Sequence, residues 1–119
     1  MAAIAALLTT EDLLALPDDG IDRELIEGEL REKPLTTRGV PHCLVTVNLS
    51  HALRDWLRRQ PRPRGLLVAG EARVRLRRDP DTVVGIDLAY IAADLATQTG
   101  NDAKYIDGPP VLAARSAAT

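Results

Sequence analysis

The sequence predicts an α/β fold, in which one long helix packs on a mixed α+β sheet. Alternating apolar and polar residues at 23–32 and 73–77 indicate strands, and the apolar run 83–91 indicates a strand that is buried on both faces. A helical apolar period across residues 42–59 indicates the helix. At 119 residues, the chain 1–119 is expected to form one domain around one core.

The N-terminal part of the chain predicts a short helix and a β-hairpin. The helix spans residues 10–16, with Thr9 or Thr10 as its N-cap and acidic residues in its first turn. Two short alternating runs then flank Glu27-Gly28. Because glycine accepts the positive φ of a tight turn, this segment predicts the hairpin.

The long helix begins near Pro41, a residue type that favours the first helical turn. Its apolar residues fall on one stripe, formed by Val45, Leu49, Leu53 (or Ala52) and Trp56. Residues at this spacing share one face of a helix, so we expect the stripe to be buried against the sheet.

The second half of the chain predicts the remaining strands. Residues 66–68 form a short strand, and residues 73–77 alternate so that three arginines face away from Val74 and Leu76. The segment Asp79-Pro80-Asp81 is a turn before the buried strand.

The C-terminal part predicts little regular structure. Residues 92–104 are a loop or one weak helix, and residues 105–110 are a turn. Residues 111–114 begin one more strand.

Asp87 lies in the middle of the buried strand and is the first candidate for chemistry. A buried carboxylate costs several kcal/mol unless it is paired or bound to a metal. Its neighbours on the same face, Gly85 and Ala89, are small and leave room for an ion or a substrate. An ion pair with Arg73 or Arg75, or backbone N–H donors, would satisfy it equally well.

Three further side chains are candidates for a functional site. Glu24 starts a hairpin strand, and its position alone favours a solvent-facing side chain. His42 lies in the first turn of the long helix, where it can reach a neighbouring site. His51 falls on nearly the opposite side of that helix, which makes a metal shared by the two histidines improbable.

Charge is segregated along the chain, although the net charge is only -2. Residues 33–78 carry eleven bases and two acids, whereas residues 1–32 carry nine acids and two bases. A basic middle suits a phosphate-bearing partner, and it also suits internal ion pairs or a solvated face. The candidate phosphate contacts are Arg73, Arg75 and Arg77.

Composition narrows the class of protein further. The single Cys43 excludes an internal disulfide and a cysteine-based zinc cluster, and it indicates a reducing, cytoplasmic compartment. No apolar run approaches the roughly 20 residues that span a membrane, so we expect no membrane association. With no Phe, one Trp and two Tyr, the core must use small side chains, and we expect either modest stability or help from a partner subunit.

Four motifs occur in a distinctive order: Glu24–Leu30, His42 at the start of a long helix, Asp79–Thr82 leading into Gly85–Ile91, and Asp107–Ala113. Together they resemble the Uma-two family of putative restriction endonucleases, which is part of the PD-(D/E)XK nuclease-like superfamily. The resemblance extends from about Thr10 to Ala113.

The resemblance implies a restriction-endonuclease-like core and a divalent-metal site that cleaves DNA. Asp87 and a glutamate in the next strand would hold Mg²⁺ or Mn²⁺, with Glu24 close to the same site. Hard carboxylate oxygens suit these ions, which activate water and stabilise charge on the phosphate. The candidate catalytic and metal-binding residues are therefore Glu24 and Asp87.

Arg115 stands where the resemblance places the second metal-binding glutamate. A cation at that position repels a metal ion, and the strands that follow in the family are absent, so we expect a C-terminally truncated domain with impaired or lost nuclease activity. We also expect Asp87 to pair with Arg115 or a central arginine. The uncovered sheet edge should favour a homodimer.

Three hypotheses account for these residues. The chain is an impaired nuclease, or it is an active nuclease in which another acid completes the site of Glu24 and Asp87, within the chain or across a dimer. The third hypothesis is a non-enzymatic module that binds nucleic acid or protein through the arginine-rich region 54–78.

Overall fold

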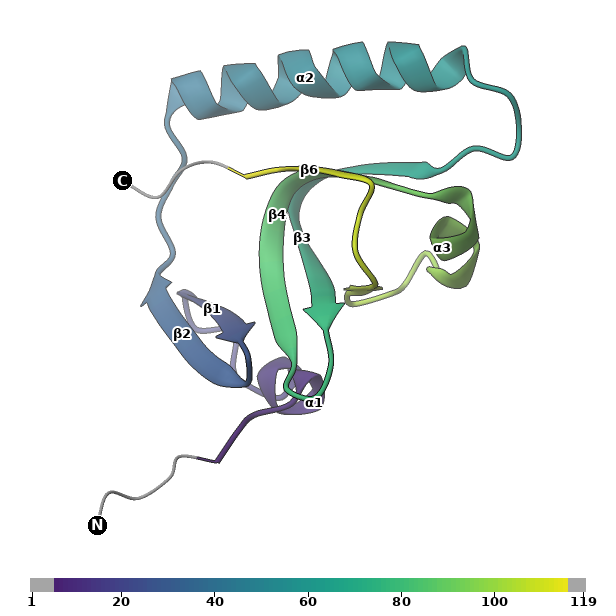
Figure 1. Cartoon of the computed structure of the whole chain (residues 1–119). Coiled ribbons are helices and arrows are strands. Elements are labelled where there is room, and N and C mark those ends of the chain that lie inside the picture. The colour runs from purple at the N-terminus through teal and green to yellow at the C-terminus, as the bar shows by residue number, and fades with distance from the viewer. Residues whose placement is uncertain (1–5, 116–119) are drawn as a thin grey trace.

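A computed structural model of the chain describes residues 6–115, which form a six-stranded mixed sheet and three helices (Figure 1). In chain order the elements are α1 (Thr10–Leu14), β1 (Ile21–Ile26), β2 (Glu29–Pro34), α2 (Val40–Arg58), β3 (Leu66–Arg77), β4 (Thr82–Ile91), α3 (Ala93–Gln98), β5 (Ile106–Asp107) and β6 (Leu112–Ala114). The predicted α/β class, with a long helix and a mixed sheet, is confirmed. No helix in this part of the chain is long and apolar enough to cross a membrane.

Strand β4 lies at the centre of the sheet, whose order is β2-β1-β4-β3-β5. It pairs along one edge with β3, and its other edge is shared by β1 at Val83 and by β6 at Leu88 to Tyr90. Strand β5 is parallel to β3, whereas the other pairs are antiparallel. The side chains of β4 are buried for most of its length, as its apolar sequence predicted, because they lie in the apolar core.

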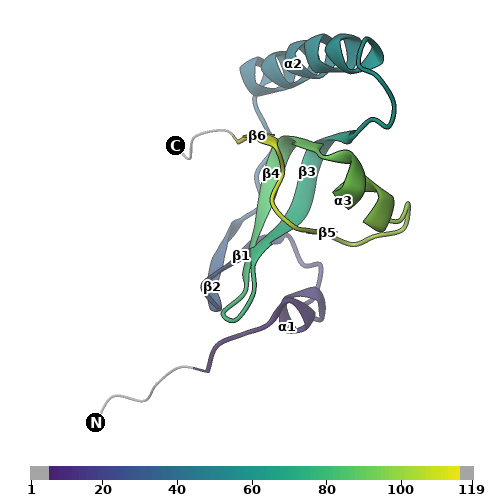
Figure 2. The same ribbon diagram turned by 45° about the vertical axis from the view of Figure 1, so that its right-hand side comes forward.

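Two apolar clusters form the core. The larger cluster comprises Val74, Val84, Ile86, Ala89, Ile91 and Ile106, with Leu95 of α3 packed against it. The smaller cluster joins Leu13 of α1 to Leu25 and Val83 of the sheet. The two clusters therefore hold α3 and α1 to the sheet (Figure 2).

The predicted helix cap and hairpin turn near the N-terminus are confirmed. Thr9 caps α1, because its hydroxyl accepts a hydrogen bond from the Asp12 backbone N–H while the Asp12 carboxylate accepts one from the Thr9 N–H. Glu27 and Gly28 have φ values of 50° and 81°, so they form the tight turn between β1 and β2.

Strand β3 is continuous where the sequence predicted two separate strands. A β-bulge between Ala69 and Ala72 places Gly70 and Glu71 opposite Asp87, and Gly70 adopts a φ of 104° that favours glycine. A second irregularity follows Arg75. Leu76, which was expected on the same face as Val74, is 41% exposed, whereas Val74 is fully buried.

The apolar stripe of α2 is largely exposed, so its predicted burial is wrong. Val45 is 63% exposed and Trp56 is 41% exposed, although Trp56 meets the Tyr90 ring edge-on at 5.4 Å between centroids. The helix lies across one end of the sheet (Figure 1), and cavities of about 440 Å³ and 340 Å³ lie between them. Gly70, at the wall of the larger cavity, has no side chain that could fill this space.

The C-terminal part holds more structure than predicted. Residues 105–110 were expected to form a turn, but Ile106 and Asp107 form β5 beside Val74 and Arg75 of β3. The expected weak helix is α3, and the expected last strand is β6.

An ion network centred on the buried guanidinium of Arg75 ties these distant segments together. The Arg75 guanidinium donates two hydrogen bonds of 2.8 Å to the Asp107 carboxylate and a third, of 3.2 Å, to the Thr10 hydroxyl. It also lies 3.8 Å from Asp81 and 5.1 Å from the centroid of the Tyr105 ring. One side chain thus connects α1, the β3–β4 turn and β5.

The network shifts the pKa values of its ionisable members. Hydrogen bonds from Arg75 lower the pKa of Asp107 to about 2, and Asp107 in turn raises the pKa of Arg75. The pKa of Asp81 is also lowered, chiefly by the hydrogen bond from the Thr10 hydroxyl, at 2.6 Å. All these shifts favour the charged forms that the network uses.

We expect acid to weaken the fold through Asp107. Because its pKa falls from 3.8 to about 2 on folding, the carboxylate stabilises the chain above pH 3.8, and this contribution is lost as the pH drops toward 2. Asp107→Asn should lower the free energy of unfolding at neutral pH and flatten its decline in that acid range. Urea titrations followed by circular dichroism measure both effects. Asp102→Asn, on the exposed preceding loop, is the matched control; the same pH slope for Asp107→Asn as for the unaltered chain would contradict the expectation.

Candidate functional site

The candidate site surrounds Asp87, at the end of the sheet that faces α2. The Asp87 side chain is only 12% exposed, and its Oδ1 lies 3.9 Å from Nε2 of His42. His42 occupies the first turn of α2, directly after Pro41, as the sequence predicted. The structure thus brings a helical imidazole to the central carboxylate of the sheet.

Glu24 reaches the same site from β1. Its Oε2 accepts a hydrogen bond of 3.0 Å from the Gly85 backbone N–H, two residues before Asp87 on β4. Its Oε1 accepts a 2.7 Å hydrogen bond from Nη2 of Arg115. The side chain is therefore largely buried, and the solvent-facing placement that its position alone favoured does not occur.

Arg115 lies beside Asp87 at the end of β6. The register pairs Leu88 with Ala114, and the next position along both strands brings Arg115 opposite Asp87. Both residues line the cavity of about 340 Å³ under α2. We expected Arg115 or a central arginine to balance Asp87; the structure shows Arg115 paired with Glu24, and His42 beside Asp87.

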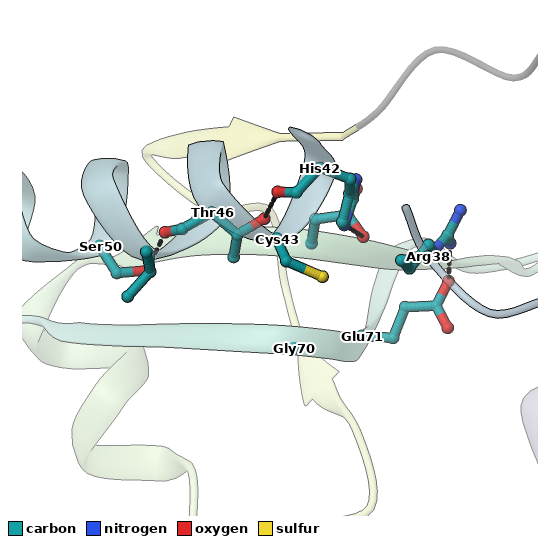
Figure 3. A pocket seen from close by; sticks show the side chains of 9 residues that line it. Arg38, His42, Cys43, Thr46, Ser50, Gly70 and Glu71 are labelled. Carbon is teal, nitrogen blue, oxygen red and sulfur yellow. Dashed lines mark hydrogen bonds and ion pairs between the residues drawn. The ribbon is translucent and has the colours of Figure 1, made fainter. Parts of the chain in front are cut away.

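Glu71 is a third carboxylate near the site, and the sequence reasoning missed it. The bulge at Gly70 brings Glu71 opposite Asp87, and its side chain passes within van der Waals distance of the space beside the Gly85 Cα. Its Oε1 accepts a 2.8 Å hydrogen bond from Arg38 (Figure 3). A glycine inside a strand pattern often marks a bulge, so Gly70 was the signal that could have revealed it.

A cavity of about 440 Å³ separates α2 from the bulge of β3, as Figure 3 shows. The Ser50 hydroxyl donates to the Thr46 carbonyl oxygen, and the Thr46 hydroxyl donates to that of His42. Both hydroxyls therefore serve the helix backbone rather than a reacting group. Cys43 is exposed at the cavity wall and forms no disulfide with the described residues.

The three candidate phosphate contacts lie in different environments. The guanidinium of Arg75 is buried and bound to Asp107, so it is already occupied within the chain. Arg77 is exposed and lies 3.6 Å from Glu27. Arg73 is half-buried and makes no ion pair within residues 6–115. Phosphate contact by these arginines stays a prediction.

A comparison with protein-family models gives a match to this chain. The model of the Uma2 family, described as putative restriction endonuclease, matches residues 10–115 of the chain. The comparison with curated proteins gave no match. Restriction-endonuclease-like families generally use divalent metals.

The residues around Asp87 do not fit a divalent metal as they are arranged. Among the described residues, no three His, Cys, Asp or Glu side chains converge to hold an ion. Glu24 is engaged by Arg115 and by the Gly85 N–H, and Arg115 contributes a positive charge where a metal ligand would be negative. The mismatch therefore centres on residue 115.

We expect the substitution Arg115→Glu to create affinity for Mn²⁺. It would release Glu24 and place a third carboxylate beside Asp87. Two unit charges 4 Å apart interact by about 4 kcal/mol at an effective dielectric of 20, so reversing this charge should tighten Mn²⁺ binding at least about tenfold. Isothermal titration calorimetry measures the change. Arg54→Glu, on an exposed part of α2, has the same charge change; equal Mn²⁺ affinities for the two variants would refute the expectation.

Proposed function

Because the chain belongs to the Uma2 family, we propose that it is a nuclease-type, DNA-binding protein whose metal-dependent cleavage is impaired. The observation that carries this proposal is the 2.7 Å contact between Arg115 and Glu24, next to Asp87. Glu24 and Asp87 are the residues that such chemistry would use, and the guanidinium neutralises one of them.

The physical argument concerns charge at one position. Metal-assisted phosphodiester hydrolysis needs hard oxygen ligands that hold the ion against the phosphate. Arg115 adds a fixed cation on the strand next to Asp87, and a guanidinium stays protonated at any working pH. Such a cation attracts a DNA phosphate but repels a divalent metal, which supports binding without efficient cleavage.

Glu71 supports a second candidate function, an active nuclease. Its carboxylate lies at the bulge opposite Asp87, so Glu24, Asp87 and Glu71 would together supply three acids. This arrangement requires the Arg38–Glu71 and Arg115–Glu24 pairs to open first. A non-enzymatic binding module through region 54–78 remains the third hypothesis, because Arg54, Arg58 and Arg62 are exposed.

Besides DNA, we propose that a second copy of this chain is a binding partner. The exposed apolar residues of α2, and of β6 with the residue before it, include Val40, Leu44, Val45, Val47, Val111 and Leu112. Together with the outer edge of β6 they offer an apolar surface and backbone groups to a second copy. The exposed thiol of Cys43 fits the reducing cytoplasm that we propose as the compartment.

We expect the unaltered chain to nick supercoiled DNA no faster than its Asp87→Ala variant, in Mg²⁺ or Mn²⁺. The physical reason is the Arg115 cation, which competes with the metal for Glu24. Gel electrophoresis of plasmid DNA measures nicking. Robust cleavage that is lost in Asp87→Ala would overturn the impaired-nuclease proposal, and cleavage lost also in Glu71→Gln would favour the second candidate.

We expect the chain to be a homodimer at micromolar concentration, and Val45→Asp to shift it toward monomer. Val45 is exposed on α2, so the charge should disturb the interface without disturbing the core. Light scattering coupled to gel filtration measures the mass. Gln98→Asp on the exposed end of α3 is the control; a monomeric unaltered chain would contradict the dimer.

A further inference from the structure

A separate cavity, of about 490 Å³, lies at the free edge of β3. Strand β5 pairs with β3 only at Val74 and Arg75, so within residues 6–115 the earlier part of β3 has no strand on that side. The segment 99–105, which leads from α3 to β5, passes this edge instead, on the side that Figure 2 shows. The cavity is the space between the strand and this segment.

Two cations line the cavity from opposite sides. Arg73 comes from β3 and is half-buried, and Lys104 comes from the facing segment and is exposed. Neither forms an ion pair with another described residue. The cavity wall includes one acid, Glu71, and its Oε1 is already bound to Arg38. The wall therefore carries a surplus of positive charge, which favours an anionic ligand.

An aromatic ring lies beside the two cations. Tyr105 is half-buried at the cavity wall, and the Arg75 guanidinium lies over its ring, 5.1 Å from the centroid. Because Asp107 fixes that guanidinium, the ring is held in place. Leu66 and Val68 add apolar surface, and Asn101 adds an amide.

We propose that this cavity binds one nucleotide unit, with its phosphate between Arg73 and Lys104 and its base against Tyr105. Charge-assisted hydrogen bonds from a guanidinium and an ammonium suit a phosphate, and bases stack on aromatic rings whatever their sequence. The volume falls within the range of small-molecule sites, about 300–1,000 Å³. The inference goes beyond the proposed function, because it requires neither a metal nor cleavage.

The site adjoins the one around Asp87. Glu71 lines both this cavity and the cavity beneath α2. A nucleotide bound at Tyr105 would therefore lie next to the carboxylates of the candidate nuclease site. Its source is either a free nucleotide or one unit of a DNA single strand, and the two share the chemistry that the wall recognises.

The test is titration of the ¹⁵N-labelled full chain, followed by NMR, with three probes. The probes are deoxyadenosine 5′-monophosphate, a short single-stranded oligodeoxyadenylate and inorganic phosphate. We expect amide shifts centred on residues 99–106 and Arg73, with inorganic phosphate binding more weakly than either nucleotide probe. Tighter binding of the oligonucleotide than of the monophosphate assigns the site to a DNA strand, and the reverse assigns it to a free nucleotide.

Variants connect the binding to the two cations. Arg73→Gln and Lys104→Ala should each weaken nucleotide binding about tenfold, as expected for the loss of one hydrogen bond to a charged group. Arg31→Gln removes an equal charge from exposed β2 and should change binding little. The proposal is overturned if neither nucleotide shifts residues 99–106, if inorganic phosphate binds as tightly as the monophosphate, or if Arg31→Gln weakens binding as much as Arg73→Gln. Because the shifts are measured on the unaltered chain, a variant that fails to fold leaves the first two outcomes decisive.

Discussion

The arrangement of α1, the β3–β4 turn and β5 in this domain depends on the ion pair and hydrogen bonds of the buried Arg75 guanidinium. Removing a charge from water is costly, and the structure offsets that cost with the Asp107 carboxylate, the Thr10 hydroxyl and the nearby Asp81. These partners come from β5, α1 and the β3–β4 turn. Strand β5 has only two residues, and this ion pair adds to its backbone pairing with β3 and to the burial of Ile106 in the core. The position of Tyr105 and of the segment before it follows from the same contact.

A second constraint acts at the other end of the sheet, where glycines determine which side chains meet. Gly85 leaves space beside β4, and Glu71 enters that space from the bulge at Gly70. Glu24 binds the Gly85 backbone N–H from the opposite side. A Cβ at residue 85 would lie in ordinary van der Waals contact with Glu71. The acids gather around Asp87 through the bulge of β3 and the hydrogen bond from the Gly85 N–H to Glu24, and Arg115 adds a positive charge beside them.

The sequence predicted the local structure well where the signal was local. The capping residue Thr9, the turn at Glu27-Gly28 and the apolar run of β4 each depend on neighbouring residues, and each is confirmed. The stripe on α2 was misjudged because a helical period shows that one face is apolar, but it does not show what covers that face. The sequence predicted two strands where the structure has the single strand β3. A bulge interrupts the alternation of apolar and polar residues without ending the strand.

By itself, the sequence determined the fold class, the burial of Asp87, the proximity of His42 and the family to which the chain belongs, since local patterns and motif order carry these properties. Only the tertiary structure decided which charges pair. Arg75 was a candidate for Asp87 or for phosphate and instead binds Asp107, which lies 32 positions along the chain. The bulge in β3 places Glu71 at the site. Arg115 forms an ion pair with Glu24, which lies on a strand that is distant in sequence. Ion pairs form between groups that the sheet brings together, and strand register, rather than residue type, sets those distances.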